Sequence, residues 1–229
     1  MGARRVLGRS AMEQGTQKVE DFELGKPALV CRWRLAGGRL PLENRHLRAL
    51  GARVVVGRAV STQLISWAKQ HIEWTLADGS AANPDGVLML VMDAEGRAAM
   101  SVGPYAPLCR VDAVALAERA ASAEREAAET GVAPETLWAV RDGALVWGAR
   151  DGAAAHGAAS LVVDLARTLG IEVSRDEGLL SSVAAGDLPE QVFLCSDEHG
   201  VVPASDADGD LVERFAAGYA KLLSATKSR

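Results

Sequence analysis

The chain has 229 residues, with 25 Lys and Arg against 30 Asp and Glu, and therefore a formal charge of −5. Hydrophobic residues make up 48% of it, which is enough to build a core and excludes a disordered protein or a disulfide-stapled mini-protein. The acidic balance, with no basic block longer than Arg4-Arg5, argues against nucleic acid or an anionic membrane as the main partner.

The cysteines and the apolar runs indicate the compartment. Cys31, Cys109 and Cys195 are odd in number and far apart, so they predict neither a disulfide framework nor a zinc site. The longest apolar run, over residues 86–92, is far shorter than the ~18 residues that a membrane-spanning helix needs, and no signal-peptide run opens the chain. We expect a cytoplasmic protein with a flexible leader over residues 1–22.

The first half of the chain alternates apolar runs, glycine turns and one clear helical period. In chain order we expect a hairpin over residues 29–40, a short helix over 42–50, a long helix over 61–79 and a second hairpin over 86–102. The long helix is the best defined, because Ser61 is a suitable N-cap and apolar side chains recur at helical spacing from Leu64 to Leu76.

The second half begins with an Ala-rich helix and then mixes strands with helices. We expect a helix over residues 112–130 that stops at Gly131, a hairpin over 137–147, a helix over 157–169, short strands at 171–173, 191–195 and 201–203, and a last helix over 211–225. This order predicts a two-lobed α+β protein, with a small domain over residues 23–108 and a large domain over residues 109–229.

The richest polar cluster is Ser196-Asp197-Glu198-His199, in a turn between two predicted strands. A carboxylate–histidine pair beside Cys195 is the kind of group that moves protons in catalysis, but the same residues also suit a solvated turn. Asp206, Asp208 and Asp210 lack the glycine and glutamate spacing of a calcium loop, so no metal site is expected.

Several stretches resemble the class IV aminotransferases, the fold-type IV group of pyridoxal-phosphate (PLP) enzymes that includes branched-chain aminotransferases and aminodeoxychorismate lyases. Residues 28–50 are similar to the family's opening strand, glycine turn and His-Leu helix. The clearest similarity joins residues 137–146, 157–173 and 192–203 to a strand, a helix and a hairpin of the family in the same order. The resemblance implies a shortened two-lobed fold of the D-amino acid aminotransferase type.

The family's residue that binds the PLP aldehyde has no counterpart in this sequence. The family forms a Schiff base on a lysine that lies after the small domain and before the helix matched by residues 157–169. The chain has no lysine between residues 70 and 220. The resemblance therefore implies a degenerate member that lacks the nucleophile.

The phosphate-binding residues of the family are altered as well. Its helix arginine falls on Ala49, one residue after Arg48, and Ser160 replaces the arginine of its later glycine motif. Asp197 and Glu198 would bring negative charge near the expected phosphate, and a PLP phosphate is itself nearly a dianion. We therefore expect no cofactor.

Three interpretations follow. In the first, the protein has lost PLP-dependent catalysis, and the old cofactor cleft serves small-molecule binding or non-PLP chemistry. In the second, it is an active PLP aminotransferase or aminodeoxychorismate lyase whose lysine lies elsewhere; in the third, it is a structural partner subunit of an active homologue. Whether it is an enzyme stays open.

The resemblance also implies a homodimer, or a heterodimer with a homologue, because small-domain elements of one family subunit border the pocket of the other. The candidate cleft residues are Arg48, Ser160, Ser196, Asp197, Glu198 and His199.

Overall fold

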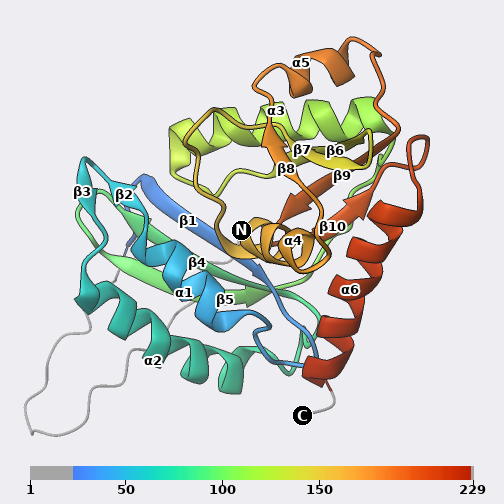
Figure 1. The fold of residues 1–229 in the computed structure, drawn as a ribbon. Coiled ribbons are helices and arrows are strands. Elements are labelled where there is room, and N and C mark those ends of the chain that lie inside the picture. The colour runs from blue at the N-terminus through green and yellow to red at the C-terminus, as the bar shows by residue number, and fades with distance from the viewer. Residues whose placement is uncertain (1–22, 228–229) are drawn as a thin grey trace, which may run out of the picture.

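The computed structural model describes residues 23–227, so the leader predicted over residues 1–22 lies outside the described residues. The described chain forms two lobes, each built on one main sheet with helices packed against it (Figure 1). The predicted two-lobed α+β architecture is confirmed.

The small lobe contains a three-stranded antiparallel sheet of order β1-β4-β5, with two helices on one face (Figure 1). Its elements are β1 (Pro27–Arg34), α1 (Glu43–Gly51), α2 (Thr62–Gly79), β4 (Val87–Asp93) and β5 (Ala98–Gly103). Leu29, Cys31 and Trp33 are buried beneath α1 and α2. Because side chains alternate along a strand, Arg32 and Arg34 lie on the opposite face of β1.

The first predicted hairpin is wrong in its pairing. Ala36 and Arg39 form only a single β-bridge, whereas β1 pairs with β4 from Pro27 opposite Asp93 to Arg34 opposite Val87. β1 pairs with β4 because the local segment after the glycine turn has too few residues to form hydrogen bonds with all the backbone groups of β1. A small hairpin of β2 (Val54–Val55) and β3 (Arg58–Ala59) follows α1 and was not predicted.

The large lobe contains a five-stranded mixed sheet of order β10-β9-β6-β7-β8, in which only β7 and β8 run parallel. Its strands are β6 (Thr136–Arg141), β7 (Ala144–Trp147), β8 (Val173–Arg175), β9 (Gln191–Ser196) and β10 (Gly200–Pro203). Helices α3 (Ala113–Thr130) and α5 (Leu179–Ala184) cover one face, and α4 (Gly157–Thr168) and α6 (Asp210–Lys227) cover the other. Alternate side chains of β6 therefore pack into two separate hydrophobic cores, one on each face of the sheet.

Most local predictions are confirmed. The hairpins β4–β5, β6–β7 and β9–β10 and the helices α1 to α4 and α6 form where the sequence placed them, within a few residues. Gly131 ends α3 with a φ of 65°, and the turn between β6 and β7 places Asp142 and Gly143 in the left-handed region. Strand β8 begins two residues later than predicted, and α5 was not predicted.

The lobes meet through backbone contacts as well as side chains. Val30 N–H donates to Gly131 O at 3.1 Å, and Arg34 N–H donates to Asp197 O at 3.0 Å. A Cβ on Gly131 would lie 2.0 Å from Ala28 O, so glycine is the residue that allows this approach. The junction therefore brings β1 against the turn between β9 and β10.

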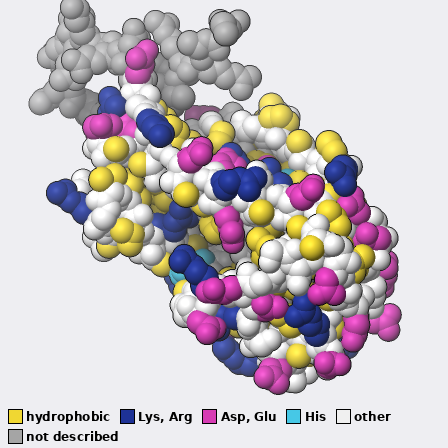
Figure 2. All heavy atoms as spheres, turned by 90° about the horizontal axis from the view of Figure 1, so that it is seen from above, with side chains coloured by type: hydrophobic (Ala, Val, Ile, Leu, Met, Phe, Trp, Pro, Cys, Tyr) yellow, Lys and Arg dark blue, Asp and Glu magenta, His cyan; other side chains and the backbone are white. Residues whose placement is uncertain are grey.

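The described surface carries charges of both signs. Figure 2 shows basic and acidic side chains interspersed over the face seen from above, with no extended field of one sign. Between residues 23 and 227, no helix combines the length and the apolar character needed to cross a membrane.

Candidate functional site

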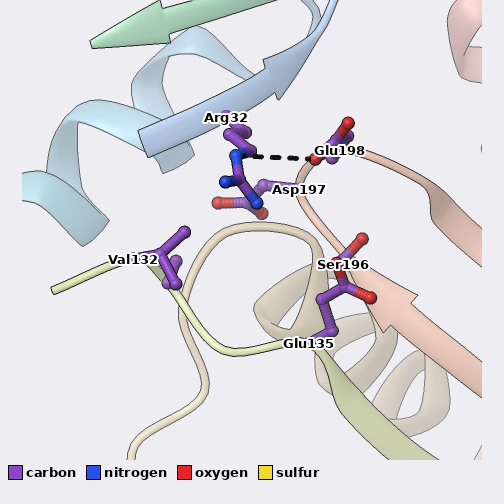
Figure 3. Close-up of a pocket in the computed structure, with 7 residues that line it drawn as sticks. Arg32, Val132, Glu135, Ser196, Asp197 and Glu198 are labelled. Carbon is purple, nitrogen blue, oxygen red and sulfur yellow. Dashed lines mark ion pairs between the residues drawn. The ribbon is translucent and has the colours of Figure 1, made fainter. Parts of the chain in front are cut away.

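A small polar pocket lies where the two lobes meet (Figure 3). Its wall includes Arg32 from β1, Glu135 just before β6, Ser196 at the end of β9, and Asp197 and Glu198 from the turn that follows. The enclosed volume is about 20 Å³, close to what one water molecule requires. The pocket therefore has room for a water-sized group.

Glu135 is the buried charge beside this pocket. It is 6% exposed, and Arg119 of α3 binds it with both prongs: Nε donates to Oε2 at 2.9 Å and Nη2 to Oε1 at 2.6 Å. Such a bidentate pair compensates the cost of burying a carboxylate. Arg119 therefore fixes the position of Glu135 against the pocket.

His199 links Glu135 to the small lobe. Its Nδ1 lies 3.3 Å from the hydroxyl of Tyr105, and its Nε2 lies 3.8 Å from Glu135 Oε1. Burial lowers the pKa of His199 more than the neighbouring carboxylates of Glu135 and Glu198 raise it, so the ring is neutral near pH 7. Tyr105, His199, Glu135 and Arg119 thus form one chain of polar groups across the lobes.

The guanidinium of Arg34 stacks over the ring of Tyr105, with Arg34 Cζ 3.3 Å from the ring centroid. Burial raises the pKa of Tyr105, which outweighs the opposing effect of Arg34, so the hydroxyl stays protonated at neutral pH. Cys195, at the end of β9, is buried, and burial raises the pKa of its thiol too. It is therefore a buried thiol rather than a thiolate nucleophile.

The polar chain does not have the character of a metal centre. Glu135, Glu198 and His199 each offer one ligand atom within 4.8 Å of the others, and they are the one such group in the described chain. However, Arg119 already binds both oxygens of Glu135, and Arg32 Nε lies 4.0 Å from Glu198 Oε2 (Figure 3). The two guanidinium groups supply positive charge where a metal ion would need to bind.

The first turn of α4 holds the carboxylate of Asp197. Ala158 N–H donates to Asp197 Oδ1 at 2.7 Å. Gly157 has a φ of 52°, and a Cβ on it would lie 2.0 Å from the same oxygen. His46 of α1 approaches from the other side, with Nδ1 3.4 Å from Oδ2 and a ring that is 3% exposed. A carboxylate of the chain itself thus occupies the positive end of the helix.

The other two predicted cleft residues lie apart: Ser160 is in the first turn of α4, and Arg48 is on α1. Ser160 Oγ donates to Gly157 O at 2.7 Å and accepts from Arg45 Nη1 at 3.0 Å, whereas Arg48 is exposed on α1, and its Nε donates to Asn44 O at 3.2 Å. Arg45 and His46 therefore face α4 in place of Arg48.

Sequence reasoning missed the residues that complete the junction. They are Arg34, His46, Tyr105, Arg119 and Glu135, which come from five separate segments. One local signal was available: two arginines at alternate positions of the apolar strand β1 place their charges together on the half-buried face, opposite Cys31 and Trp33.

The residues at the junction do not fit PLP. Lys26, Lys69, Lys221 and Lys227 are the lysines of the described chain, and all four are exposed. None lines the pocket, and Lys227 pairs with Asp85 at 2.8 Å on the far end of α6. Among residues 23–227, no lysine would lie beside an aldehyde cofactor in the pocket, and Asp197 fills the helix end that could receive its phosphate.

No protein-family model matches the chain, and neither does any curated protein. Solved structures do match. A putative 4-amino-4-deoxychorismate lyase of Legionella pneumophila is 11% identical, with 85% of this chain and 90% of that chain covered and a TM-score of 0.53. The 4-amino-4-deoxychorismate lyase of Pseudomonas aeruginosa is 19% identical over the same shares, with a TM-score of 0.54.

A hypothetical aminotransferase from Mycobacterium tuberculosis, in its apo form, is 16% identical, with 92% of this chain and 94% of that chain covered and a TM-score of 0.55. Identities this low establish the architecture and leave the activity to the site. The chain has the fold of the aminodeoxychorismate lyases and class IV aminotransferases, the fold-type IV PLP enzymes.

Proposed function

We propose that this protein is a PLP-independent relative of the fold-type IV enzymes, in which the junction of the lobes serves small-molecule binding or non-PLP chemistry. The position of the lysines carries this proposal: every lysine among residues 23–227 is exposed, and none lines the interlobe pocket. PLP enzymes hold the cofactor aldehyde on a lysine beside the reacting atoms.

The polar chain across the lobes supports a role for the junction. Tyr105 and His199 are both half-buried, and burial raises the pKa of Tyr105 and lowers that of His199. Groups with shifted pKa values occur more often at functional sites than elsewhere. A small polar ligand in this pocket could contact Arg32, Glu135 and Glu198 together, with His199 3.8 Å from Glu135. These residues would bind and orient such a ligand.

A structural partner subunit is the second candidate, and the size of the pocket favours it. A volume of about 20 Å³ admits no cofactor unless the lobes separate. Under this candidate the protein would act through its surface by pairing with a homologue.

Both candidates include a dimer, homomeric or with a homologue. The face of the small sheet opposite α1 and α2 carries Met89, Val91 and Ala99, which are only half-buried within one chain. A second subunit would remove this apolar surface from water. Light scattering at micromolar concentration should give a mass well above 24.0 kDa, and a clean monomer would contradict the dimer.

The proposal is tested by incubation with PLP, reduction with borohydride and peptide mass mapping. We expect at most scattered, substoichiometric adducts on exposed lysines, and the variants Lys69→Arg and Lys221→Arg serve as controls for such labelling. A stoichiometric adduct on a single lysine, together with aminotransferase activity, would show that the protein is an active PLP enzyme.

The two candidates are separated by what copurifies. Mass spectrometry after denaturation should find a small molecule under the first candidate, and Glu198→Gln and His199→Gln should lose it while the exposed control Glu177→Gln keeps it. A homologous protein recovered in fixed stoichiometry, with no small molecule, would favour the partner subunit.

A further inference from the structure

The N-terminus of α4 has the features of an anion site. The helix is 12 residues long, its N-cap residue His156 makes no side-chain cap, and the amide of Ala158 is bound by a carboxylate from a distant turn. Gly157 contributes by lacking a side chain, because the Asp197 carboxylate lies where a Cβ would be. Free amides and the helix dipole together favour a negative group at this point.

A second observation, independent of the helix, also points to an anion. His46 is buried on α1, its ring stacks on Trp33 with centroids 5.3 Å apart, and its Nδ1 makes no hydrogen bond within the described chain. That nitrogen faces Asp197 Oδ2 at 3.4 Å, too far for good hydrogen-bond geometry. A buried polar atom without a partner is uncommon in folded proteins. A larger oxyanion would reach both the helix amides and His46.

We propose that Asp197 is the resident anion of an oxyanion site, formed by the first turn of α4 and His46, and that its carboxylate excludes phosphate from this site. The inference deepens the proposed loss of PLP, on which it rests, because it names the residue that takes the position of a ligand phosphate. The ligand class excluded is inorganic phosphate and phosphate monoesters.

The site is accessible enough for such a ligand once the carboxylate is removed. The side chain of Asp197 is 14% exposed, so the pocket connects with solvent at this point. Asp197→Gly would vacate the space of a carboxylate and its methylene group, which is close to the size of a phosphate ion. Arg45 donates to Ser160 Oγ in the first turn of α4 and is also paired with Asp164 at 2.8 Å, so its charge is largely neutralised and His46 remains the polar side chain available to the anion.

The test compares phosphate binding by the full chain and its variants, measured by calorimetry and by thermal unfolding in phosphate against KCl of equal ionic strength. We expect Asp197→Gly to bind inorganic phosphate at least about tenfold more tightly than the wild type, since one charge-assisted hydrogen bond corresponds to a factor of this size. Asp208→Gly, which changes an exposed aspartate, should behave as the wild type. Adding His46→Leu to Asp197→Gly should weaken phosphate binding again by several-fold.

Asp197→Ser provides a second route if the glycine variant does not fold. Serine leaves most of the space open, and its hydroxyl can accept from Ala158 N–H or donate to phosphate. The inference is supported if either folded variant gains phosphate binding that depends on His46. It is overturned if a folded variant binds phosphate no better than the wild type, which would make Asp197 a structural cap only, or if the wild type already binds phosphate equally well.

The outcome of the phosphate experiment can be distinguished from that of the PLP test of the proposed function. If Asp197→Gly binds phosphate and still forms no borohydride-reducible adduct with PLP, both the inference and PLP independence stand. A wild-type adduct at one lysine would remove the proposed function, whereas a folded Asp197→Gly protein without phosphate affinity would remove only the assignment of Asp197.

Discussion

The N-termini of α2 and α4 are completed in different ways. At α2 the cap is local and exposed: Ser61 Oγ accepts from Leu64 N–H at 3.1 Å, three residues along the chain. At α4 the cap is distant and mostly buried, since Asp197 lies 39 residues beyond Ala158, and its carbonyl also accepts from Arg34 in the small lobe. The first cap stabilises one helix, whereas the second ties α4, β1 and α1 together.

This difference shows where the molecule concentrates its polar interactions. Asp197 uses its side chain for α4 and His46 and its backbone for β1, so a single residue contacts elements of both lobes. Glu135 joins two elements of the large lobe, because Arg119 of α3 binds it and it lies near His199 of the turn after β9. Buried polar networks of this kind are costly when one member is missing.

The largest expected effect is that of Asp197→Ala. The change frees the Ala158 amide and leaves His46 without the charge it faces, which should lower the free energy of unfolding by about 2 to 3 kcal/mol. Urea denaturation measures this loss. The exposed control Asp208→Ala should stay within about 0.5 kcal/mol of the wild type, and an equally small loss at Asp197 would remove the distinction between the two caps.

Gly157→Ala tests the same contact from the side of the helix, since Gly157 of α4 lies against the Asp197 carboxylate. Alanine would be strained at a φ of 52°, and its Cβ would meet the Asp197 carboxylate at 2.0 Å, so we expect a loss of about 1 to 3 kcal/mol. In a double-mutant cycle, Asp197→Gly should remove the clash, so that the combined loss is smaller than the sum of the two single losses. Strict additivity would mean that the carboxylate does not lie against Gly157.

The elements that the sequence predicted correctly are those specified by neighbouring residues. Ser61 caps a helix that begins next to it, and Asp142-Gly143 makes a two-residue turn between adjacent strands. In each case the physical cause lies within about four residues. The two-lobed fold could also be predicted, because the order of these local elements limits the ways in which they can pack.

The remainder depends on contacts between distant residues. The partner of β1 is β4, far along the chain, and the local glycine turn gave a misleading hairpin. The candidate turn with Asp197 was found from its polar character, but its position on α4 and the pairing of Glu135 with Arg119 follow from tertiary packing. Single-sequence patterns contain no signal for such pairs.

Ser61→Ala should have a smaller effect than either change at α4. The serine is exposed and caps only its own helix, so we expect a loss of about 1 kcal/mol, because water can replace part of the lost hydrogen bond. Ser66→Ala, at an exposed position within α2, is the matched control and should be neutral or slightly stabilising. Equal losses at Ser61 and Asp197 would show that burial and distance do not distinguish the two caps.

The smallest effect concerns α3, whose N-cap Asp112 is local like Ser61 but carries a charge. The hydrogen bond from Ala115 N–H, helped by Arg110, outweighs partial burial and holds the pKa of Asp112 below the ordinary value of 3.8. Because the folded pKa is below the unfolded one, the charge stabilises the protein above about pH 4, and the contribution is lost as the pH falls through the folded value. Asp112→Asn should therefore be less stable than the wild type at pH 6.

The difference between Asp112→Asn and the wild type should shrink as the solution is acidified below about pH 4, since the unfolded carboxyl is protonated first and the stabilisation is lost as the pH falls through the lower folded pKa. Thermal unfolding of both proteins at several pH values measures this difference in stability. The contributions of the other carboxylates cancel, because both proteins contain them. A second carboxylate, Asp206, also accepts from α3, at Ala113 N–H, and should keep the effect modest. Parallel stability curves would indicate that the charge of Asp112 is irrelevant and that α3 is capped, as α2 is, by a hydrogen bond alone.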